Sequence, residues 1–370
     1  MTDSEVLFTG FPGFLGSALL ERVLARGDGP VACLVQSQYL ETAQRRAQTI
    51  VDSTEVADAA GDGTVADDAI RLYEGDITEA DLGLGDAISD LDAVREVYHL
   101  AAIYDLGVDP GPAEAVNVRG TEHVLDVAER LTVEHLHYVS TCYVSGRYDG
   151  VFTESHLQEG QSFNNHYEKS KYRAEVAVQQ RMDEGLPATV YRPAIVVGDS
   201  RTGETDKYDG PYYLLELLRA QPRCLSASFT LANSADAELN VVPRDFVVDA
   251  IACLSARTRS RGAVYQLCDP SPLPVPRFLD VLADAAGHRA VTLPTTRRVG
   301  RAVLSRLESA GFAVEPEALD YLDHPTRYAC PATRRALVGS DIEVPPFESY
   351  AGRLVEFVRQ NPNLGDDPMV

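Results

Sequence analysis

A glycine-rich turn near the start of the chain constrains the fold more than any other feature of the sequence. Residues 6–9, VLFT, read as a short buried strand, and an apolar-periodic helix continues to about Arg26. Between them, TGFPGFLG places Gly10, Gly13 and Gly16. Glycines there allow a tight turn, close helix–strand packing and close approach of a pyrophosphate to the helix N-terminus. We predict a nucleotide-binding turn, although the spacing is G-x-x-G-x-x-G and a purely structural turn is the alternative.

Strands and helices alternate through the first half of the chain. Further strands are expected at residues 31–35, 70–76, 94–102, 136–141 and 188–198, with helices at 38–51, 113–131 and 165–184. This alternation predicts a parallel sheet with right-handed crossovers and helices on both faces, an α/β doubly wound fold of the Rossmann type. Residues 52–68 are small and acidic, and we expect a solvated loop there.

The pattern loosens after Gly198, where a polar, glycine-rich segment follows. We expect a dinucleotide-binding domain at residues 1–198, to which the chain returns at 239–269. A smaller, mixed C-terminal region for substrate binding is expected from 199–238 and 270–360, with 361–370 as a tail. Its pieces are discontinuous in the sequence, and many prolines interrupt its helices.

The charge of the chain narrows the classes of partner. Its 370 residues carry a formal net charge of −23, with thirty arginines but only three lysines. Such a charge repels nucleic acid and anionic membrane surfaces, so neither is expected as a partner. Few lysines and many carboxylates also suit a salt-rich cytosol, and salt adaptation is therefore a hypothesis.

Targeting and cysteine patterns indicate a cytoplasmic protein. The acidic N-terminus has no apolar signal core, and no apolar run approaches the roughly 20 residues of a membrane helix. The six cysteines are scattered, without a C-x-x-C pair or histidines at metal-ligand spacing. We therefore expect free thiols, a reducing compartment and no metal site.

The segment NNHYEKSKYR holds two of the three lysines. Tyr167 and Lys171 are four apart in a helical pattern, so both point to one face. A tyrosine has a pKa of about 10, and a nearby ammonium would lower it toward the range useful for acid–base catalysis. The compact lysine head could also bind a ribose hydroxyl, which the bulkier, planar guanidinium of arginine would not do equally well. Lys169 lies on another face and is expected to point into solvent.

A third candidate group ends the strand at 136–141. Ser140 and Thr141 would lie at the carboxyl end of a parallel strand, where folds of this type bind ligands. A hydroxyl there could hold a substrate oxygen, and the alternative is a hydroxyl pair that only caps the loop.

The end of the second strand bears on the choice of cofactor. An acidic residue there would bind the ribose 2′-hydroxyl of NAD, whereas a basic group accommodates the 2′-phosphate of NADP. This chain has the neutral Gln36, and Arg45 and Arg46 follow one helix further on. They could reach a 2′-phosphate or simply be solvated helix residues. The missing acid favours NADP over NAD.

The motifs together resemble the extended short-chain dehydrogenase/reductases over roughly residues 5–270. They are, in the order of that superfamily, TGFPGFLG, GDI, HLAA, NVRGT, VSTCYVSG, YEKSK and YRPAIVVG. The segment VGDSRTGETDKYDGPYY at 197–213 resembles the branch of fatty acyl-CoA reductases and thioester reductases, within the epimerase/dehydratase-like enzymes. Residues 334–358 are similar to the ends of stand-alone members near that branch.

The resemblance implies a role for each matching residue. Cofactor-binding residues would be Gly10, Gly13, Phe14, Leu15 and Gly16 at the pyrophosphate, Asp76 and Ile77 beside the adenine, Ala101 and Ala102 along the channel, and Pro193, Ile195 and Val196 near the nicotinamide. Tyr167 would be the acid–base, Lys171 its partner and Thr141 the catalytic hydroxyl, with Asn117 in a core helix beside them. Thioester reductases usually carry arginine where this chain has Gln36, and their second basic residue corresponds best to Arg46, so cofactor choice stays open.

The implied activity is hydride transfer to a carbonyl or acyl-thioester substrate. A thioester would give a hemithioacetal that collapses to an aldehyde, and an acyl-CoA or a separate carrier protein would deliver it. One alternative is an NAD-dependent sugar-nucleotide epimerase or dehydratase, or a hydroxysteroid-type dehydrogenase. Another is a non-catalytic redox sensor, which the presence of both Tyr167 and Lys171 disfavours. Analogy also suggests a homodimer through the helices at 113–131 and 165–184.

Overall fold

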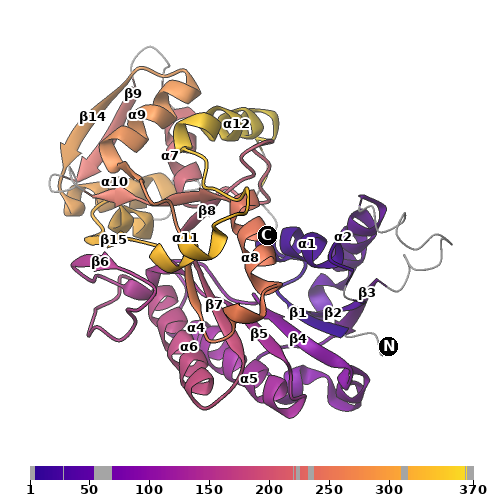
Figure 1. Cartoon of the computed structure of the whole chain (residues 1–370). Helices are drawn as coiled ribbons and strands as arrows, with labels where there is room; N and C mark the ends of the chain where they lie inside the picture. Colours follow the sequence, from indigo (N-terminus) through magenta and orange to yellow (C-terminus); the bar gives the residue numbers. More distant parts are fainter. Residues whose placement is uncertain are drawn as a thin grey trace.

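A sheet of seven parallel strands forms the centre of the protein (Figure 1). The computed structural model describes residues 5–27, 29–53, 69–219, 221, 226–231, 237–309, 316–362 and 364. Across the sheet the strands are β12 (Val264–Leu267), β7 (Ala188–Pro193), β5 (His135–Val139), β4 (Val94–His99), β1 (Glu5–Thr9), β2 (Val31–Val35) and β3 (Ile70–Glu74). The predicted α/β fold is confirmed. Most of the expected acidic loop at 52–68 lies outside the described residues.

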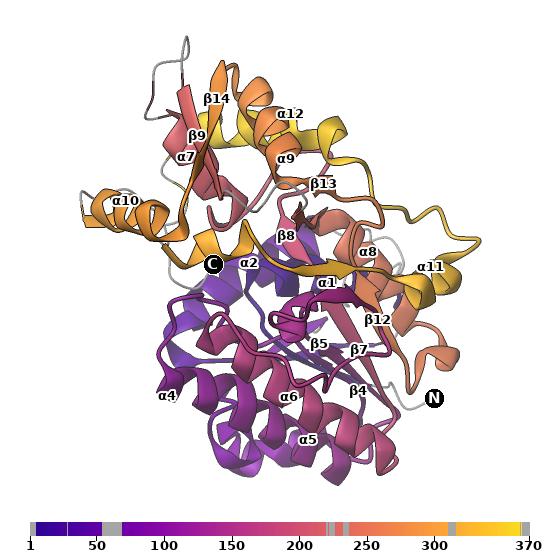
Figure 2. The ribbon, with the colours of Figure 1, turned by 90° about the vertical axis from the view of Figure 1, so that its left-hand side faces the viewer.

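Helices cover both faces of this sheet (Figure 2). One face carries α1 (Phe14–Leu24), α2 (Leu40–Ser53) and α8 (Arg244–Ser255), and the other carries α5 (Thr121–Arg130) and α6 (His166–Asp183). Successive side chains of a strand point to opposite faces, so Val6 and Phe8 pack in the first core and Leu7 in the second. This two-sided burial explains why the strands read as continuous apolar runs.

The strand order reverses beside β1, which lies between β2 and β4. Parallel sheets bind ligands outside the carboxyl ends of their strands at such a switch point. The glycine turn leaves β1 at this position. The expected helix at 113–131 forms there as three consecutive pieces, α4 (Pro110–Ala113), a π-helical turn (Glu114–Gly120) and α5.

The strand expected at 188–198 is divided in two. β7 ends at Pro193, and β8 (Ile195–Val197) pairs with β11 (Val241–Pro243) outside the main sheet. The Ala194 amide donates to Leu267 in β12, and the next amide, of Ile195, donates to Asn240. The chain therefore changes neighbours within one residue and crosses the end of the sheet.

The remaining elements form the substrate-side region, which packs over the carboxyl ends of the strands (Figure 1). Its helices are α7 (Pro211–Arg219), α9 (Val275–Ala286), α10 (Arg297–Ser309), α11 (Pro331–Leu337) and α12 (Phe347–Gln360), with the 3₁₀ turn η7 (Pro316–Tyr321). Its strand pairs are β9 (Ser226–Leu231) with β14 (Ala290–Thr295), β10 (Glu238–Leu239) with β13 (Leu273–Pro274), and β6 (Gly150–Phe152) with β15 (Thr326–Tyr328).

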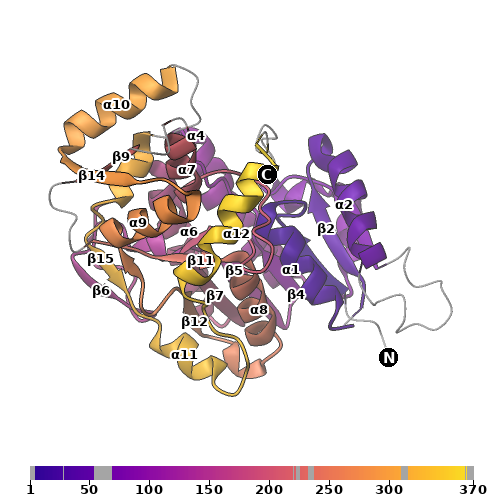
Figure 3. The same ribbon diagram turned by 90° about the horizontal axis from the view of Figure 1, so that it is seen from above.

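The chain does return to the main sheet as β12, inside the expected range 239–269. The division of the chain into two domains at the stated boundaries remains a prediction. Seen from above, α9 and α12 lie side by side over the region (Figure 3), and they pack against each other. Among the helices of the described residues, none has the length and apolarity needed to cross a bilayer.

Candidate active site

The glycine turn is packed so closely that side chains would not fit. Gly10 has φ +92°, and a Cβ atom on it would lie 2.8 Å from the Ala101 amide. A Cβ on Gly16 would lie 2.1 Å from the Gly10 carbonyl oxygen, which also accepts a hydrogen bond from the Gly13 amide. The backbone therefore brings α1, which begins at Phe14, directly onto the ends of β1 and β4. The first amides of such a helix have no partners within it and can bind an anion.

Gln36 and Asp76 meet at the ends of β2 and β3. The Gln36 side-chain amide donates to one Asp76 carboxylate oxygen at 2.7 Å, and the other oxygen accepts from the amide and hydroxyl of Thr78. Gln36 and Ile77 line the same cavity as the glycine turn. Three of the residues predicted to bind cofactor are thus brought together here.

Arg46 lies behind the glycine turn. Its guanidinium donates to the Pro12 carbonyl at 2.7 Å and forms an ion pair with Asp206 at 2.7 Å, on the segment between β8 and α7. Arg45 is exposed and donates to Thr42. Neither arginine is among the residues that line the cavity. A direct contact of Arg46 with a 2′-phosphate stays a prediction, and it would compete with Asp206.

Tyr167 stands on the first turn of α6, which Asn165 caps by accepting a hydrogen bond from the Glu168 amide. Burial raises the pKa of Tyr167 to about 12, against a smaller lowering by its hydrogen bond with the Thr141 hydroxyl. Tyr167 and Thr141 are therefore brought together as predicted by the motifs. At neutral pH this tyrosine is a neutral phenol.

Lys171 lies one turn further along α6 and is buried. Its ammonium donates to the Val139 carbonyl at 2.9 Å and lies 4.5 Å from the centre of the Tyr138 ring. Burial lowers the pKa of Lys171 to about 7, although the Glu175 carboxylate opposes the shift. The net pKa of Tyr167 is raised in this structure, in which the ammonium of Lys171 is directed to Val139, and a lowering of that pKa by Lys171 stays a prediction.

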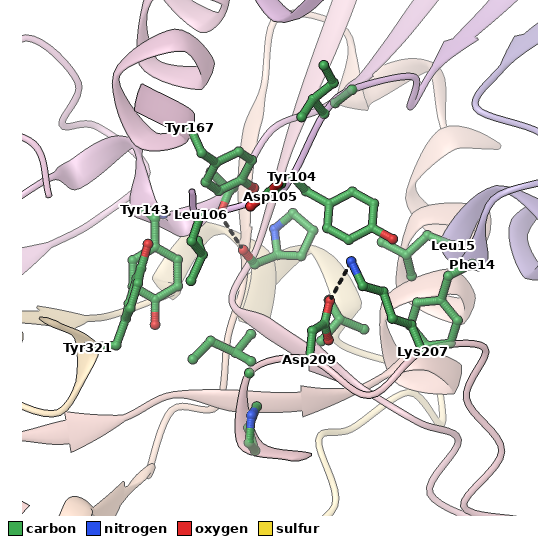
Figure 4. A pocket seen from close by; sticks show the side chains of 18 of the residues that line it. Phe14, Leu15, Tyr104, Asp105, Leu106, Tyr143, Tyr167, Lys207, Asp209 and Tyr321 are labelled. Carbon is green, nitrogen blue, oxygen red and sulfur yellow. Dashed lines mark hydrogen bonds and ion pairs between the residues drawn. The ribbon is translucent and has the colours of Figure 1, made fainter. Parts of the chain in front are cut away.

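These groups share one cavity of about 1040 Å³ (Figure 4). Its first part is lined by the glycine turn, the ends of β2 and β4, and Pro193, Ile195 and Val196. Its second part continues into the substrate-side region and is mainly aliphatic, with Leu214, Leu218, Leu279, Leu282, Val303 and Leu319 among its lining residues. Tyr143 and Tyr321 pack edge to face at 4.8 Å where the two parts meet, near Tyr167.

Comparison with known proteins identifies the family. The model of a family described as Male sterility protein, an NAD-binding family, matches residues 8–251 of the chain. The chain belongs to this family. The predicted membership of the extended short-chain dehydrogenase/reductases, in the branch of thioester reductases, is confirmed.

Individual relatives agree with this assignment. The carboxylic acid reductase of Segniliparus rugosus is 26% identical over 369 residues, which cover 93% of this chain and 30% of that protein. The terminal R domain from the myxalamid PKS-NRPS biosynthetic pathway matches with a TM-score of 0.78 at 28% identity, covering 98% of this chain and 92% of that one. A thiolation-reductase di-domain from an archaeal non-ribosomal peptide synthetase shares the fold, with a TM-score of 0.70 at 20% identity over 98% of this chain and 76% of that one. The chain spans less than a third of the length of eight curated relatives that it matches, the carboxylic acid reductase among them.

Two networks of hydrogen-bonded side chains at the site were not predicted from the sequence. Thr9 bonds His99 at 2.8 Å, His99 bonds Thr121 at 3.0 Å, and the Ala101 amide donates to Thr9. Burial, with a contribution from the charge of Lys171, lowers the pKa of His99 to about 3. This network joins β1, β4 and α5 below the turn. Its only signal in the sequence is the histidine of HLAA.

The second network lies behind the catalytic groups. The Ser140 hydroxyl donates to Glu175, and Glu175 pairs with the fully buried Arg192 at 2.6 Å. Ser140 thus uses its proton inside the protein, whereas the Thr141 hydroxyl accepts from the Tyr143 amide and makes a long contact with the Pro193 carbonyl. Of the hydroxyl pair, Thr141 is the one that acts on the pKa of Tyr167.

Asn117 occupies the position expected from the motif, buried in the π-helical turn. Its side chain accepts from the Ile103 amide and donates to Ser170 on α6 at 2.9 Å. It therefore ties Ile103, the residue after Ala101 and Ala102, to the helix of Tyr167. Lys169, on the same helix, is exposed, as predicted. Among the described residues no group of three or more metal-ligating side chains is assembled.

Proposed function

We propose that the protein reduces long-chain acyl thioesters to aldehydes with NADPH. The observation that carries this proposal is the continuity of one cavity, which joins the glycine turn, the phenol of Tyr167 and a long aliphatic arm. The arm accepts an acyl chain, and the carbonyl at the head of that chain would lie beside Tyr167 and Thr141.

The residues present fit a dinucleotide. Side chains are excluded from the turn by contacts of 2.1–2.9 Å at Gly10, Gly13 and Gly16, so the backbone is free to receive a pyrophosphate. The neutral Gln36, in place of an acid, and Arg46 nearby support NADPH over NADH. When bound, NADPH supplies the hydride for the reduction.

Tyr167 and Thr141 carry out the proton chemistry. Reduction of a thioester carbonyl adds a hydride to carbon and a proton to oxygen, giving a hemithioacetal that releases a thiol and an aldehyde. The phenol of Tyr167, with its raised pKa, keeps its proton at neutral pH and donates it to the carbonyl oxygen. Thr141, which lies beside Tyr167 and lowers its pKa, holds that oxygen, and Lys171 supplies a nearby ammonium.

A thiol carrier must present the acyl group. The archaeal structure that shares this fold contains a thiolation domain beside its reductase, which supports a carrier protein or coenzyme A in this role. We place the enzyme in the cytoplasm. We further propose a homodimer through α4–α5 and α6 and salt adaptation of the acidic surface.

The two other interpretations have less support. A nucleotide sugar carries a second diphosphate, which needs cations in the substrate arm, but the lining of this arm from α7, α9 and α10 is aliphatic. A sensor without catalysis would not need Tyr167 and Thr141 to be placed together in the cavity.

The test is oxidation of NADPH, followed by absorbance, with acyl-CoA substrates of 4 to 16 carbons in low and high salt. We expect oxidation that depends on the acyl-CoA, rises with chain length and forms aldehyde and free thiol in equal amounts. An acyl thioester of a carrier protein replaces the acyl-CoA in a second series. No oxidation with either thioester at any length would reject the proposal.

A further inference from the structure

Lys207 belongs to the segment that connects β8 to α7. It is the third lysine of the chain and the only one on the substrate-side region. Its side chain lines the same cavity as Phe14 and Leu15 at the start of α1, and its ammonium is directed between Tyr104 and Asp209 (Figure 4). The ammonium lies 4.6 Å from the centre of the Tyr104 ring.

The neighbouring residue fixes this segment beside the glycine turn. Asp206 pairs with Arg46 at 2.7 Å, and the same guanidinium nitrogen bonds the Pro12 carbonyl at 2.7 Å. Residue 206 is therefore within a few ångströms of the turn, and Lys207 follows it. Thr205 and Lys207 of this segment line the cavity together with the glycine turn.

The charge of Lys207 is only weakly compensated by its neighbours. The ion partner recorded for it is Asp209, at 3.9 Å, the long end of the range for an ion pair. Burial raises the pKa of Asp209, which disfavours its charged form. A compact ammonium on a flexible stem is suited to a phosphate that arrives in the cavity.

We propose that Lys207 binds the pyrophosphate of the dinucleotide from the side opposite the N-terminus of α1. The inference rests on the proposed cofactor site and adds to it a contact from outside the nucleotide-binding fold. The same segment leads into Gly210, Pro211 and Tyr213, which also line the cavity. Cofactor binding would thereby set the position of residues that shape the substrate arm.

The test compares dissociation constants for NADPH and NADH, measured by fluorescence titration without substrate. Lys207→Gln should raise both constants by the same factor, about 5- to 30-fold at low salt, because the pyrophosphate is common to both cofactors. Lys207→Arg should recover most of the loss. Lys169→Gln removes the same charge from an exposed site and should change neither constant.

Arg46→Gln provides the contrast within the cofactor site. If Arg46 reads the 2′-phosphate, this variant weakens NADPH and spares NADH, whereas Lys207→Gln weakens both. Equal thermal unfolding of Lys207→Gln and the wild type establishes that the fold is intact.

Constants within twofold of wild type for Lys207→Gln would overturn the inference. A raised KM for acyl-CoA with unchanged dinucleotide constants would also overturn it, since Lys207 would then bind a phosphate of the substrate. Failure of the wild type to bind any dinucleotide would instead reject the proposed function.

Discussion

The two parts of the cavity are built by different means. In the cofactor part, positions are fixed by glycines without room for a Cβ atom and by buried hydrogen bonds such as Thr9–His99. In the substrate arm, aliphatic side chains from α7, α9 and α10 meet without directional bonds. Directional contacts hold reacting groups to within fractions of an ångström, whereas apolar packing tolerates change in volume. The chemistry should therefore be intolerant of substitution, and the substrate range should be adjustable.

The largest expected effect is in the cofactor part, at Tyr167. Tyr167→Phe removes the acidic proton but leaves the ring, so kcat for thioester reduction should fall by about 10²- to 10⁴-fold. Dissociation constants for NADPH should remain within about threefold of wild type, because the phenol donates a proton to the substrate and its loss leaves the cofactor site in place. Single-turnover kinetics and fluorescence titration measure the two quantities.

A useful comparison for that variant is Tyr172→Phe, on the same helix and without a role in the cavity lining. Its activity should match the wild type. Full activity of Tyr167→Phe would show that another group donates the proton. It would also contradict the expectation that the cofactor part tolerates substitution less than the substrate arm.

The second effect is a shift of substrate range in the arm. Gly300 lies on α10, lines the cavity and is buried, and a Cβ atom there would lie 3.0 Å from a methyl of Leu319. Gly300→Leu should fill the arm and raise KM for a 16-carbon acyl-CoA relative to a 4-carbon one by roughly 5- to 150-fold, the equivalent of about 1–3 kcal/mol of overpacking. Steady-state kinetics over the chain-length series measures it.

Ser305→Leu adds the same side chain to an exposed position of α10 outside the cavity lining, and its chain-length profile should equal that of the wild type. Equal losses for short and long substrates with Gly300→Leu would mean that the acyl chain does not enter this arm.

The same contrast explains what the sequence could predict. The sheet, the glycine turn and the shared helix face of Tyr167 and Lys171 follow from local patterns, because apolar runs, glycine spacing and i, i+4 spacing are properties of short segments. The Arg46–Asp206 ion pair joins positions 160 residues apart, and no local pattern indicates it. For the same reason the sequence predicted that Arg46 binds a 2′-phosphate but gave no sign that its guanidinium is paired with Asp206.

The side chain of Lys171 shows a further limit. Its spacing from Tyr167 correctly places it at the site, but its rotamer is decided by the Val139 carbonyl and the Tyr138 ring on neighbouring β5. The aliphatic arm was likewise not predicted residue by residue, because α7, α9 and α10 contribute to it from separate parts of the chain.

The last expected effect, which changes stability and not activity, is a dependence of stability on pH in the cofactor part. Lys171 buries an ammonium there, whereas no lysine or arginine is among the described lining residues that α7, α9 and α10 contribute to the arm. Burial holds the pKa of Lys171 at about 7 in the folded protein, against about 10.4 for an unperturbed lysine. Between these values the unfolded chain binds more protons, so the contribution of Lys171 to stability rises with pH, by at most about 1.4 kcal/mol per unit. Below pH 7 both states are protonated and the contribution is constant. The unfolding free energy of the wild type minus that of Lys171→Met, both measured without cofactor, should therefore be constant below pH 7 and rise above it.

Lys169→Met supplies the matched measurement on the same helix, since the exposed Lys169 loses no solvation on folding and its difference from wild type should not change with pH. Denaturant unfolding from pH 6 to 9.5 resolves the two slopes. Parallel curves for wild type and Lys171→Met would mean that Glu175 keeps the ammonium charged in the folded state. The site would then hold a permanent cation beside Tyr167, and the pKa of the phenol would have to be lower than burial alone implies.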